Sequence, residues 1–181
     1  MSKPIAYLHS CIHNYSIMKA FFTGHRYIDE FGFANHINQL ISYARQLGTT
    51  EFYCGMALGT DQIAAKLLIK HQLKWTAVIP CADQDEKWSK QQRSHYHKLL
   101  DAASKQIVLY SKYSAGCMQA RNLWMVKRSD LCLAVWDGRD NGGTAMTVNA
   151  AIDRNLPIIQ FNPSNSKFSK IDPQYQQLSL F

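Results

Sequence analysis

The stretch Met118–Ala151, MQARNLWMVKRSDLCLAVWDGRDNGGTAMTVNAA, decides the fold, because it predicts a helix, a buried strand, a glycine turn and a second helix in succession. Apolar residues recur at helical spacing in its first part, at Met118, Leu123, Met125 and Val126. The run Leu131–Trp136 has no polar alternation, as expected of a strand that is covered on both faces. Helical periodicity returns from Ala145 to Arg154.

The turn between this strand and the second helix contains Gly142, Gly143 and Thr144. Glycines allow backbone N–H groups to approach a ligand closely, and a phosphate bound there would meet the positive end of the helix dipole. An ordinary strand-to-helix turn explains the same residues, so the pattern alone leaves both interpretations open.

A second candidate loop follows the predicted first strand, Lys19–Thr23. Open α/β sheets bind ligands at the carboxyl ends of their strands, which is where Thr23, Gly24, His25 and Arg26 lie. Gly24 permits a tight turn. The planar guanidinium of Arg26 suits a phosphate, and His25 can donate to a phosphate or a ribose hydroxyl.

A third candidate loop, Gly55–Asp61 (GMALGTD), follows the predicted strand Glu51–Cys54 and opens a helix through Leu68. Its small residues Gly55 and Gly59, next to a helix start, are typical of an anion cradle. The loop is neither a GxGxxG nor a Walker motif, because the spacing and the lysine are missing. We expect Thr60 and Asp61 to cap the helix, a role that is compatible with ribose binding by Asp61.

Strands and helices alternate along the chain, which predicts a Rossmann-like three-layer α/β sandwich with a mostly parallel sheet. The other expected elements are helix Phe33–Leu47 stopped by Gly48, strand Trp75–Ile79 ended by Pro80-Cys81, helix Trp88–Ala103, strand Gln106–Tyr110 and a last strand Pro157–Phe161. In this fold the three glycine loops should converge at one sheet edge. The acidic residues Asp83, Asp85 and Glu86 should favour the following helix start and lie near the pocket rim.

Taken in order, these motifs resemble the core of the SLOG superfamily over roughly residues 19–162. The matching residues are Thr23–Arg26, Gly55–Asp61, Met118-x-x-Arg121-Asn122-x-x-Met125, Ser129-Asp130 and Gly142-Gly143-Thr144. The superfamily includes the LOG nucleoside-monophosphate phosphoribohydrolases, the DprA DNA-processing proteins and the YpsA-like proteins, and the loops Thr23–Arg26 and Gly55–Asp61 resemble the YpsA-like branch. The resemblance implies a nucleotide ligand, self-association into a homo-oligomer, and a role for Arg121 as the active-site arginine.

One departure bears on catalysis. The LOG enzymes carry a glutamate in a GGxGTxxE pattern, where a carboxylate supports an oxocarbenium-like transition state. After Gly142-Gly143-Thr144 this chain has no acid before Asp153. We therefore expect a nucleotide-binding or nucleotide-sensing protein for NAD, ADP-ribose or a nucleoside monophosphate. The alternatives are a phosphoribohydrolase whose acid comes from another loop and a DprA-like DNA-processing module.

Composition agrees with an anionic partner. The 181 residues carry a formal net charge of +7 and a pI of about 9.2, which favours nucleotides, nucleic acid or an acidic protein surface. Five cysteines without a CxxC motif indicate a reducing cytoplasm. No apolar stretch approaches a membrane span, no signal peptide is recognisable, and no metal site or obligatory cofactor is identified.

The expected organisation is an N-terminal extension over residues 1–17, the SLOG-like domain over 18–162 and a flexible polar tail over 163–181. The tail ends in Gln177-Leu178-Ser179-Leu180-Phe181. This peptide resembles the motif by which bacterial polymerases and repair proteins bind the β sliding clamp, with Gln177 in a polar subsite and Leu178, Leu180 and Phe181 as apolar anchors. Clamp binding would indicate a bacterial or phage replication setting, and docking on the protein's own domain is the alternative.

Overall fold

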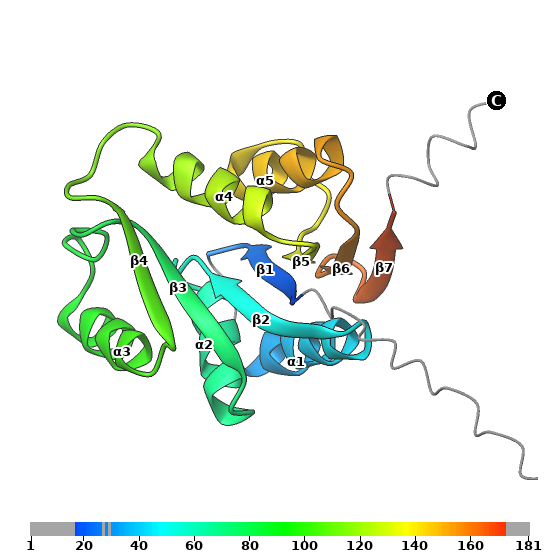
Figure 1. The fold of residues 1–181 in the computed structure, drawn as a ribbon, viewed down its shortest axis with the longest axis horizontal. Coiled ribbons are helices and arrows are strands. Elements are labelled where there is room, and N and C mark those ends of the chain that lie inside the picture. The colour runs from blue at the N-terminus through cyan, green and yellow to red at the C-terminus, as the bar shows by residue number, and fades with distance from the viewer. Residues whose placement is uncertain (1–16, 27, 29, 173–181) are drawn as a thin grey trace, which may run out of the picture.

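The computed structural model describes residues 17–26, 28 and 30–172, which form an alternating run of strands and helices (Figure 1). The elements are β1 Met18–Gly24, α1 Glu30–Gln46, β2 Thr49–Cys54, α2 Thr60–Lys70, β3 Lys74–Cys81, α3 Lys90–Asp101, β4 Lys105–Tyr110, α4 Cys117–Arg128, β5 Leu131–Val135, α5 Gly142–Asp153, β6 Ile158–Asn162 and β7 Lys167–Ile171. Of the expected N-terminal extension only Ile17 is described, and the peptide Gln177–Phe181 lies outside the described residues.

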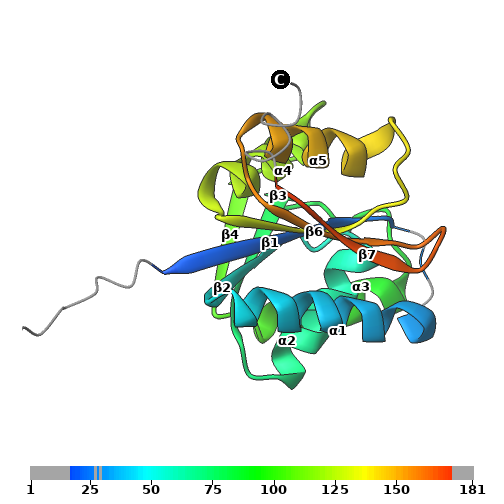
Figure 2. The same ribbon diagram turned by 90° about the vertical axis from the view of Figure 1, so that its right-hand side faces the viewer.

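The sheet has seven strands in the order β4-β3-β2-β1-β5-β6-β7, and every neighbouring pair is parallel except β6 with β7. Helices α1, α2 and α3 cover one face, and α4 and α5 cover the other (Figure 2). The expected Rossmann-like three-layer sandwich is therefore confirmed. Strands β2, β3 and β4 follow one another on one side of β1, and β5, β6 and β7 follow one another on its other side. The direction in which strands are added therefore reverses between β1 and β5. Ligands of open α/β sheets bind beyond the carboxyl ends of the strands at such a point.

The central strands supply two cores at once. In β1, Ala20 and Phe22 belong to the core under α1–α3, whereas Phe21 belongs to the core under α4 and α5. In β5, Leu133 is in register with Phe22 and Cys132 with Phe21, and each shares the core of its neighbour. Both faces of β5 are thus buried, which explains why its sequence shows no polar alternation.

Helix α1 begins at Glu30, three residues before the predicted start at Phe33. Its additional turn carries no apolar stripe, since the side chain of Phe31 is 93% exposed, and the periodicity of the sequence therefore missed it. The helix ends as expected. Gly48 adopts a φ of +94° and donates its N–H to the carbonyl of Arg45 at 3.0 Å.

Strand β3 continues through Pro80 and Cys81, where the sequence placed its end. Proline lacks the N–H that a central strand must donate. The strand tolerates Pro80 because β2 pairs with β3 only as far as Ala77, whereas pairing with β4 continues to Cys81.

Helix α3 is shorter than the predicted span Trp88–Ala103. It begins at Lys90 because Ser89 and Gln92 form a capping box. The Gln92 N–H donates to Ser89 Oγ at 3.2 Å, and the Ser89 N–H donates to Gln92 Oε1 at 3.0 Å.

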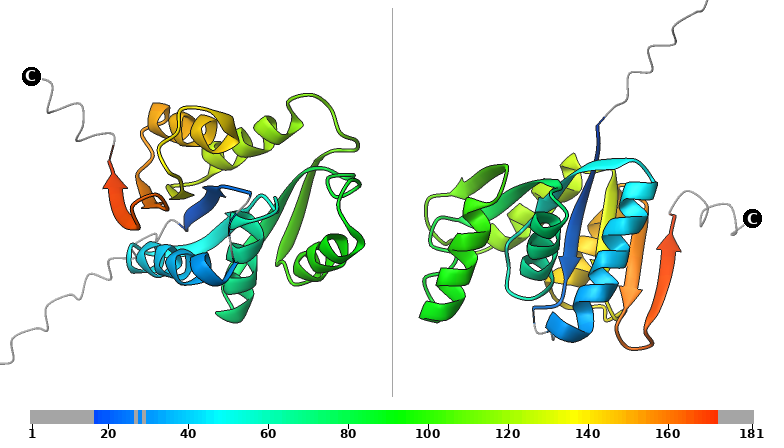
Figure 3. Two further views of the ribbon diagram at one scale, coloured as in Figure 1. Left: turned by 180° about the vertical axis from the view of Figure 1, so that it is seen from behind. Right: turned by 90° about the horizontal axis from the view of Figure 1, so that it is seen from below.

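The polar segment predicted to be a linker contains β7, which runs antiparallel to β6 (Figure 3). Phe168 is opposite Phe161, with ring centroids 5.0 Å apart, and its ring also lies 6.1 Å from that of His36. The prediction of a flexible tail from residue 163 is therefore wrong as far as Ile171, and Pro157–Phe161 is not the last strand. The sequence of β7 is mostly polar because this strand is at the sheet edge and is largely exposed.

Replacing Phe168 with alanine should lower the free energy of unfolding by about 1–3 kcal/mol, because the half-buried ring loses its packing on Phe161 and His36. Urea denaturation measures this change, and the exposed neighbour Lys167, replaced by alanine, serves as the control with an expected change within about 0.5 kcal/mol. A Phe168→Ala variant as stable as the parent would contradict a stabilising role for β7.

Candidate functional site

A cavity of about 840 Å³ opens at the carboxyl ends of β1 and β5, where the strand order reverses. The three predicted loops converge on it. In chain order, the first loop lines it with Thr23, Gly24, His25 and Arg26, the second with Ala57 and Asp61, and the third with Gly142, Gly143 and Thr144. Helix α4 contributes Met118, Arg121 and Asn122 to the remaining wall.

Gly55, Gly59 and Thr60 lie behind this wall instead of lining the cavity. Thr60 joins the second loop to the first, because its N–H and Oγ1 both donate to the carbonyl of His25, at 3.2 and 3.1 Å. A Cβ atom on Gly24 would overlap the side chain of Thr60, and one on Gly59 would overlap the backbone carbonyls of His25 and Arg26. These glycines allow the two loops to pack closely.

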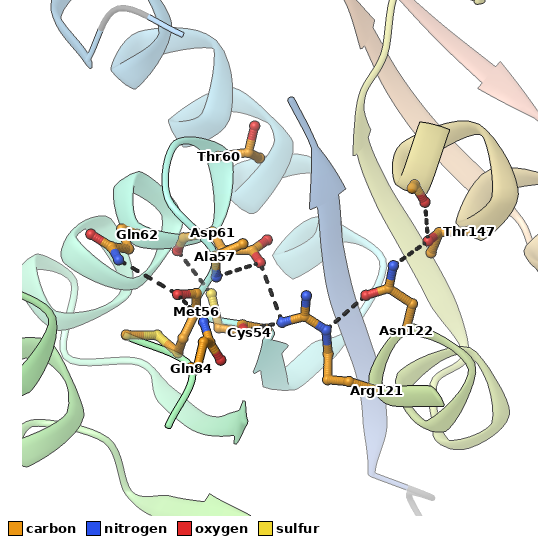
Figure 4. Close-up of polar contacts among 12 residues, drawn as sticks. Cys54, Met56, Ala57, Thr60, Asp61, Gln62, Gln84, Arg121, Asn122 and Thr147 are labelled. Atoms are coloured by element: carbon orange, nitrogen blue, oxygen red, sulfur yellow. Dashed lines mark hydrogen bonds and ion pairs between the residues drawn. The ribbon is translucent and has the colours of Figure 1, made fainter. Parts of the chain in front are cut away.

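Arg121 is the buried charge at the floor of the site. Only 4% of the residue is exposed, and its Nη1 donates to the carbonyl of Gly55. The same Nη1 lies 3.8 Å from Asp61 Oδ2 (Figure 4). A Cβ atom on Gly55 would occupy the position of the guanidinium, so glycine is required there.

A chain of hydrogen bonds extends from Arg121 to α5 (Figure 4). Arg121 Nε donates to Asn122 Oδ1 at 2.7 Å, and Asn122 Nδ2 donates to Thr147 Oγ1 at 2.8 Å. Thr147 Oγ1 in turn donates to the carbonyl of Gly143 at 2.6 Å. The second and third loops are thereby connected through α4.

Asp61 does not cap α2, contrary to the prediction. The N-cap is Gly59, which has no side-chain cap, and Asp61 Oδ2 instead accepts from the N–H of Ala57 at 3.1 Å. Burial raises the pKa of the Asp61 carboxyl, and the Arg121 guanidinium opposes that rise. Burial likewise lowers the pKa of Arg121, and Asp61 opposes that change. Each group therefore favours the charged form of the other.

The backbone of the loop Gly55–Asp61 is held by two buried glutamine side chains. Met56 adopts a φ of +60° with a fully buried side chain, and its carbonyl accepts from Gln84 Nε2 at 2.8 Å and from Gln62 Nε2 at 3.5 Å. The thiol of Cys54 donates to the carbonyl of Asp61 at 3.0 Å. A non-glycine residue at positive φ is strained, so these contacts stabilise the loop in one conformation.

A second group of ionisable residues, His25, Asp137 and Arg139, lies at the loops after β1 and β5. His25 Nε2 lies 3.3 Å from Asp137 Oδ1, and Arg139 Nε donates to Asp137 Oδ2 at 2.7 Å. Burial raises the pKa of Asp137, but hydrogen bonds from Arg139 and the nearby His25 outweigh it, so the pKa lies below its usual value. Arg139 itself lines the cavity.

Several site residues were missed by the sequence reasoning, namely Ala57, Asn122, Arg139, Thr147 and Asp153. Asn122 was part of the quoted motif and Ala57 part of the loop Gly55–Asp61, but neither had an assigned role, and Asp153 was named only as the next acid after the glycine turn. Arg139 and Thr147 had no signal, because only the fold brings them to the cavity. The apolar face predicted for α4 is wrong at Leu123, which is 36% exposed, while Arg121 is buried. Arg128 is exposed, and its guanidinium carbon lies 4.3 Å from the centroid of the Trp124 ring.

The acidic residues Asp83, Asp85 and Glu86 do not line the cavity, but Asp83 accepts a hydrogen bond from the backbone of Tyr113, which does line it. Asp85 instead accepts from Arg93 Nε at 3.2 Å and lies 3.0 Å from His97 Nε2. These acids precede α3 by more than three residues, and Ser89 caps that helix. Tyr113 is 65% exposed at the cavity mouth.

Helix starts at the cavity differ from the start of α3. Helices α2, α4 and α5 begin there after Gly59, Gly116 and Asn141, and none of the three has a side-chain cap. Helix α3, outside the cavity, has a complete capping box. Gly142, Gly143 and Thr144 form the first turn of α5 and line the cavity, and no side chain caps the N–H groups of this turn.

Residues 32–160 match the YpsA family model, which is described as the YspA SLOG family. The chain belongs to this SLOG family. It is 31% identical over 126 residues to the uncharacterized SPbeta prophage-derived protein YoqJ of Bacillus subtilis (strain 168), a match that covers 58% of this chain and 74% of YoqJ.

Solved structures share the SLOG fold at low sequence identity. DNA processing protein A (DprA) from Streptococcus pneumoniae aligns with a TM-score of 0.62 and 17% identity, over 80% of this chain and 50% of DprA. The chain thus spans half of that protein. The molybdenum cofactor carrier protein of Chlamydomonas reinhardtii aligns with a TM-score of 0.54 and 20% identity, over 80% of this chain and 76% of that chain. TM1055 aligns with a TM-score of 0.53 and 13% identity, over 78% and 72%.

No group of three or more His, Cys, Asp or Glu side chains in residues 17–26, 28 and 30–172 could hold a metal ion. Over the same residues, every helix is too short or too polar to cross a membrane.

Replacing Asp61 with asparagine should lower the free energy of unfolding by about 3 kcal/mol, because the buried guanidinium of Arg121 loses its carboxylate partner. Urea denaturation measures the loss. Asp153→Asn is the matched control, since this exposed carboxylate lines the same cavity and its neutralisation should change stability by less than about 0.5 kcal/mol. Equal stability of the Asp61→Asn variant and the parent would rule out the ion pair as a structural requirement.

Proposed function

We propose that the cavity binds a nucleotide, either an NAD-like or ADP-ribose-like compound or a nucleoside monophosphate, and that the protein acts as a nucleotide-binding sensor. The observation that carries the proposal is the uncapped start of α5 at the cavity. A phosphate there would accept from the N–H groups of Gly142, Gly143 and Thr144 and would be stabilised by the helix dipole.

The size and charge of the cavity support the same ligand class. Its volume of about 840 Å³ lies within the range of small-molecule sites. The exposed guanidinium of Arg26 faces the cavity from the loop after β1, and Arg139 faces it from the loop after β5. Arg26 can donate to phosphate oxygens, and Arg139, whose Nε donates to Asp137, can do so through its Nη groups. Arg121 is already bound through both Nε and Nη1, to Asn122, Gly55 and Asp61.

The polar groups near Arg121 argue for binding without hydrolysis. In the GGxGTxxE pattern of the LOG enzymes the glutamate lies three residues after the threonine, a position that Thr147 occupies here. Its hydroxyl is hydrogen-bonded to Asn122 and Gly143. The carboxylates that line the described cavity are Asp61, which is bound to Ala57 and paired with Arg121, and Asp153 in the last turn of α5. Neither stands at the sequence position of the missing glutamate.

A titration of the full chain with AMP, ADP-ribose and NAD should give a saturable rise in melting temperature with one of them. Replacing Arg26 with alanine should weaken that affinity about tenfold, because one charge-assisted hydrogen bond is lost. Arg128→Ala is the matched control, since Arg128 packs on Trp124 outside the cavity.

The same samples separate a sensor from an enzyme. Unchanged ligand after prolonged incubation is expected, whereas release of the free base and ribose 5-phosphate would identify a phosphoribohydrolase. The absence of binding by all three compounds would overturn the proposal.

We also propose that Gln177–Phe181 binds the β sliding clamp. The peptide contains a glutamine followed by three apolar residues, Leu178, Leu180 and Phe181, in the order of the clamp-binding motif. It follows the edge strand β7 by only a few residues, so a clamp bound to it would lie next to the SLOG domain.

Deleting Gln177–Phe181 should reduce affinity for the clamp at least tenfold, because the apolar anchors Leu178, Leu180 and Phe181 are lost. Surface plasmon resonance with immobilised clamp measures the change, and Ser179→Ala, which keeps the anchors, should bind like the parent. Clamp affinity that is unchanged by the deletion would exclude this role. Nucleotide binding should be the same with and without the peptide.

A further inference from the structure

Two buried thiols lie in contact beside the cavity. Cys81 is the last residue of β3, Cys117 is the first residue of α4, and their Sγ atoms are 4.0 Å apart. The residues are 0% and 2% exposed. Of the four described cysteines, the other two lie elsewhere. Cys54 donates its thiol hydrogen to the carbonyl of Asp61, and Cys132 is in the core under α4 and α5.

We propose that Cys81 and Cys117 are a reversible oxidation site, at which a peroxide converts the two thiols into a disulfide that fastens the start of α4 to the end of β3. The inference does not depend on the proposed nucleotide ligand. A disulfide has an S–S distance of about 2.05 Å, so the sulfurs must approach by about 2 Å, which rotation of the two short side chains and a small shift of the helix start can supply.

The chemistry balances with a peroxide as the oxidant. Hydrogen peroxide oxidises one thiol to a sulfenic acid and releases one water molecule. The second thiol then attacks the sulfenic sulfur, its proton leaves with the departing hydroxyl group as a second water molecule, and the S–S bond forms. Two thiols and one peroxide thus yield one disulfide and two waters.

The surroundings of the two residues decide where this chemistry begins. Burial raises the pKa of Cys81 to about 12, so this residue remains a thiol in the closed protein. Cys117 directly follows the loop Ser111–Gly116, in which every residue is exposed, and its N–H is held by the carbonyl of Ser114 at 3.1 Å. Local opening of this loop would admit peroxide to Cys117 first. Cys81 then acts as the resolving thiol on β3.

The disulfide would change the wall of the cavity. Gly116 and Met118, on either side of Cys117, both line it, and Arg121 projects from the next turn of α4. Joining Cys117 to β3 would restrict the movement of the start of α4 relative to the loops after β1 and β2. The cross-link also closes a chain segment of 36 residues, which constrains the unfolded state.

The test is oxidation of the full chain with hydrogen peroxide, followed by denaturation, alkylation of free thiols and peptide mass spectrometry. We expect a Cys81–Cys117 linked peptide, a loss of two alkylatable thiols and full reversal by dithiothreitol. The melting temperature should rise by roughly 5–10 °C on oxidation, because the loop closure stabilises the folded state.

Three variants make the result specific. Cys132→Ser, the matched buried cysteine outside the pair, should behave like the parent, whereas Cys81→Ser and Cys117→Ser should form no linked peptide and show no rise in melting temperature. The parent and Cys132→Ser decide the question even if the other two fold poorly. Free Cys81 and Cys117 after oxidation, a disulfide to a different cysteine, or irreversible sulfinic acid at either position would each overturn the proposal.

Discussion

The buried guanidinium of Arg121 is the constraint on which the geometry of the cavity depends. A charge removed from water costs several kcal/mol unless protein groups replace its hydration. Here the replacements are the carbonyl of Gly55 after β2, the carboxylate of Asp61 on α2 and the amide of Asn122 on α4. All three must lie around one planar group, so they place β2, α2 and α4 relative to one another. The lack of a side chain at Gly55 follows directly, because the guanidinium fills that space.

The polar side chains around Arg121 form hydrogen bonds with one another and with the backbone. Asn122 and Thr147 carry the hydrogen-bond chain to Gly143, and Gln84 and Gln62 hold Met56. The residues that line the cavity outside this network include the first turn of α5, Arg26 and Arg139. A rigid floor below donors of this kind fits the proposed phosphate-bearing ligand, since preorganised donors lose little entropy when they bind.

Membership of the SLOG family and the chemistry of the site answer different questions. The chain shares its fold with DprA and with the molybdenum cofactor carrier protein. Its own strand order has the switch point at which open α/β sheets bind ligands. What happens to the ligand depends on single side chains. Thr147 is neutral where the LOG pattern has a carboxylate, and its hydroxyl takes part in the network that holds α4 to α5. A threonine there supplies hydrogen bonds and no negative charge.

The sequence by itself determined the alternation of strands and helices, the continuous burial of β5 and the three glycine loops at strand ends, because these depend on local periodicity and backbone freedom. It missed β7, whose edge position leaves its polar side chains in solvent, and it misjudged the acidic cluster at Asp85, which pairs with Arg93 on the neighbouring helix. Only the tertiary structure decided that Asp61 pairs with Arg121 instead of capping α2, that Gly55 makes room for a guanidinium, and that Cys117 meets Cys81. Each of these contacts joins residues that are far apart in the chain, and such pairings are set by how the layers pack and leave no periodic trace in the sequence.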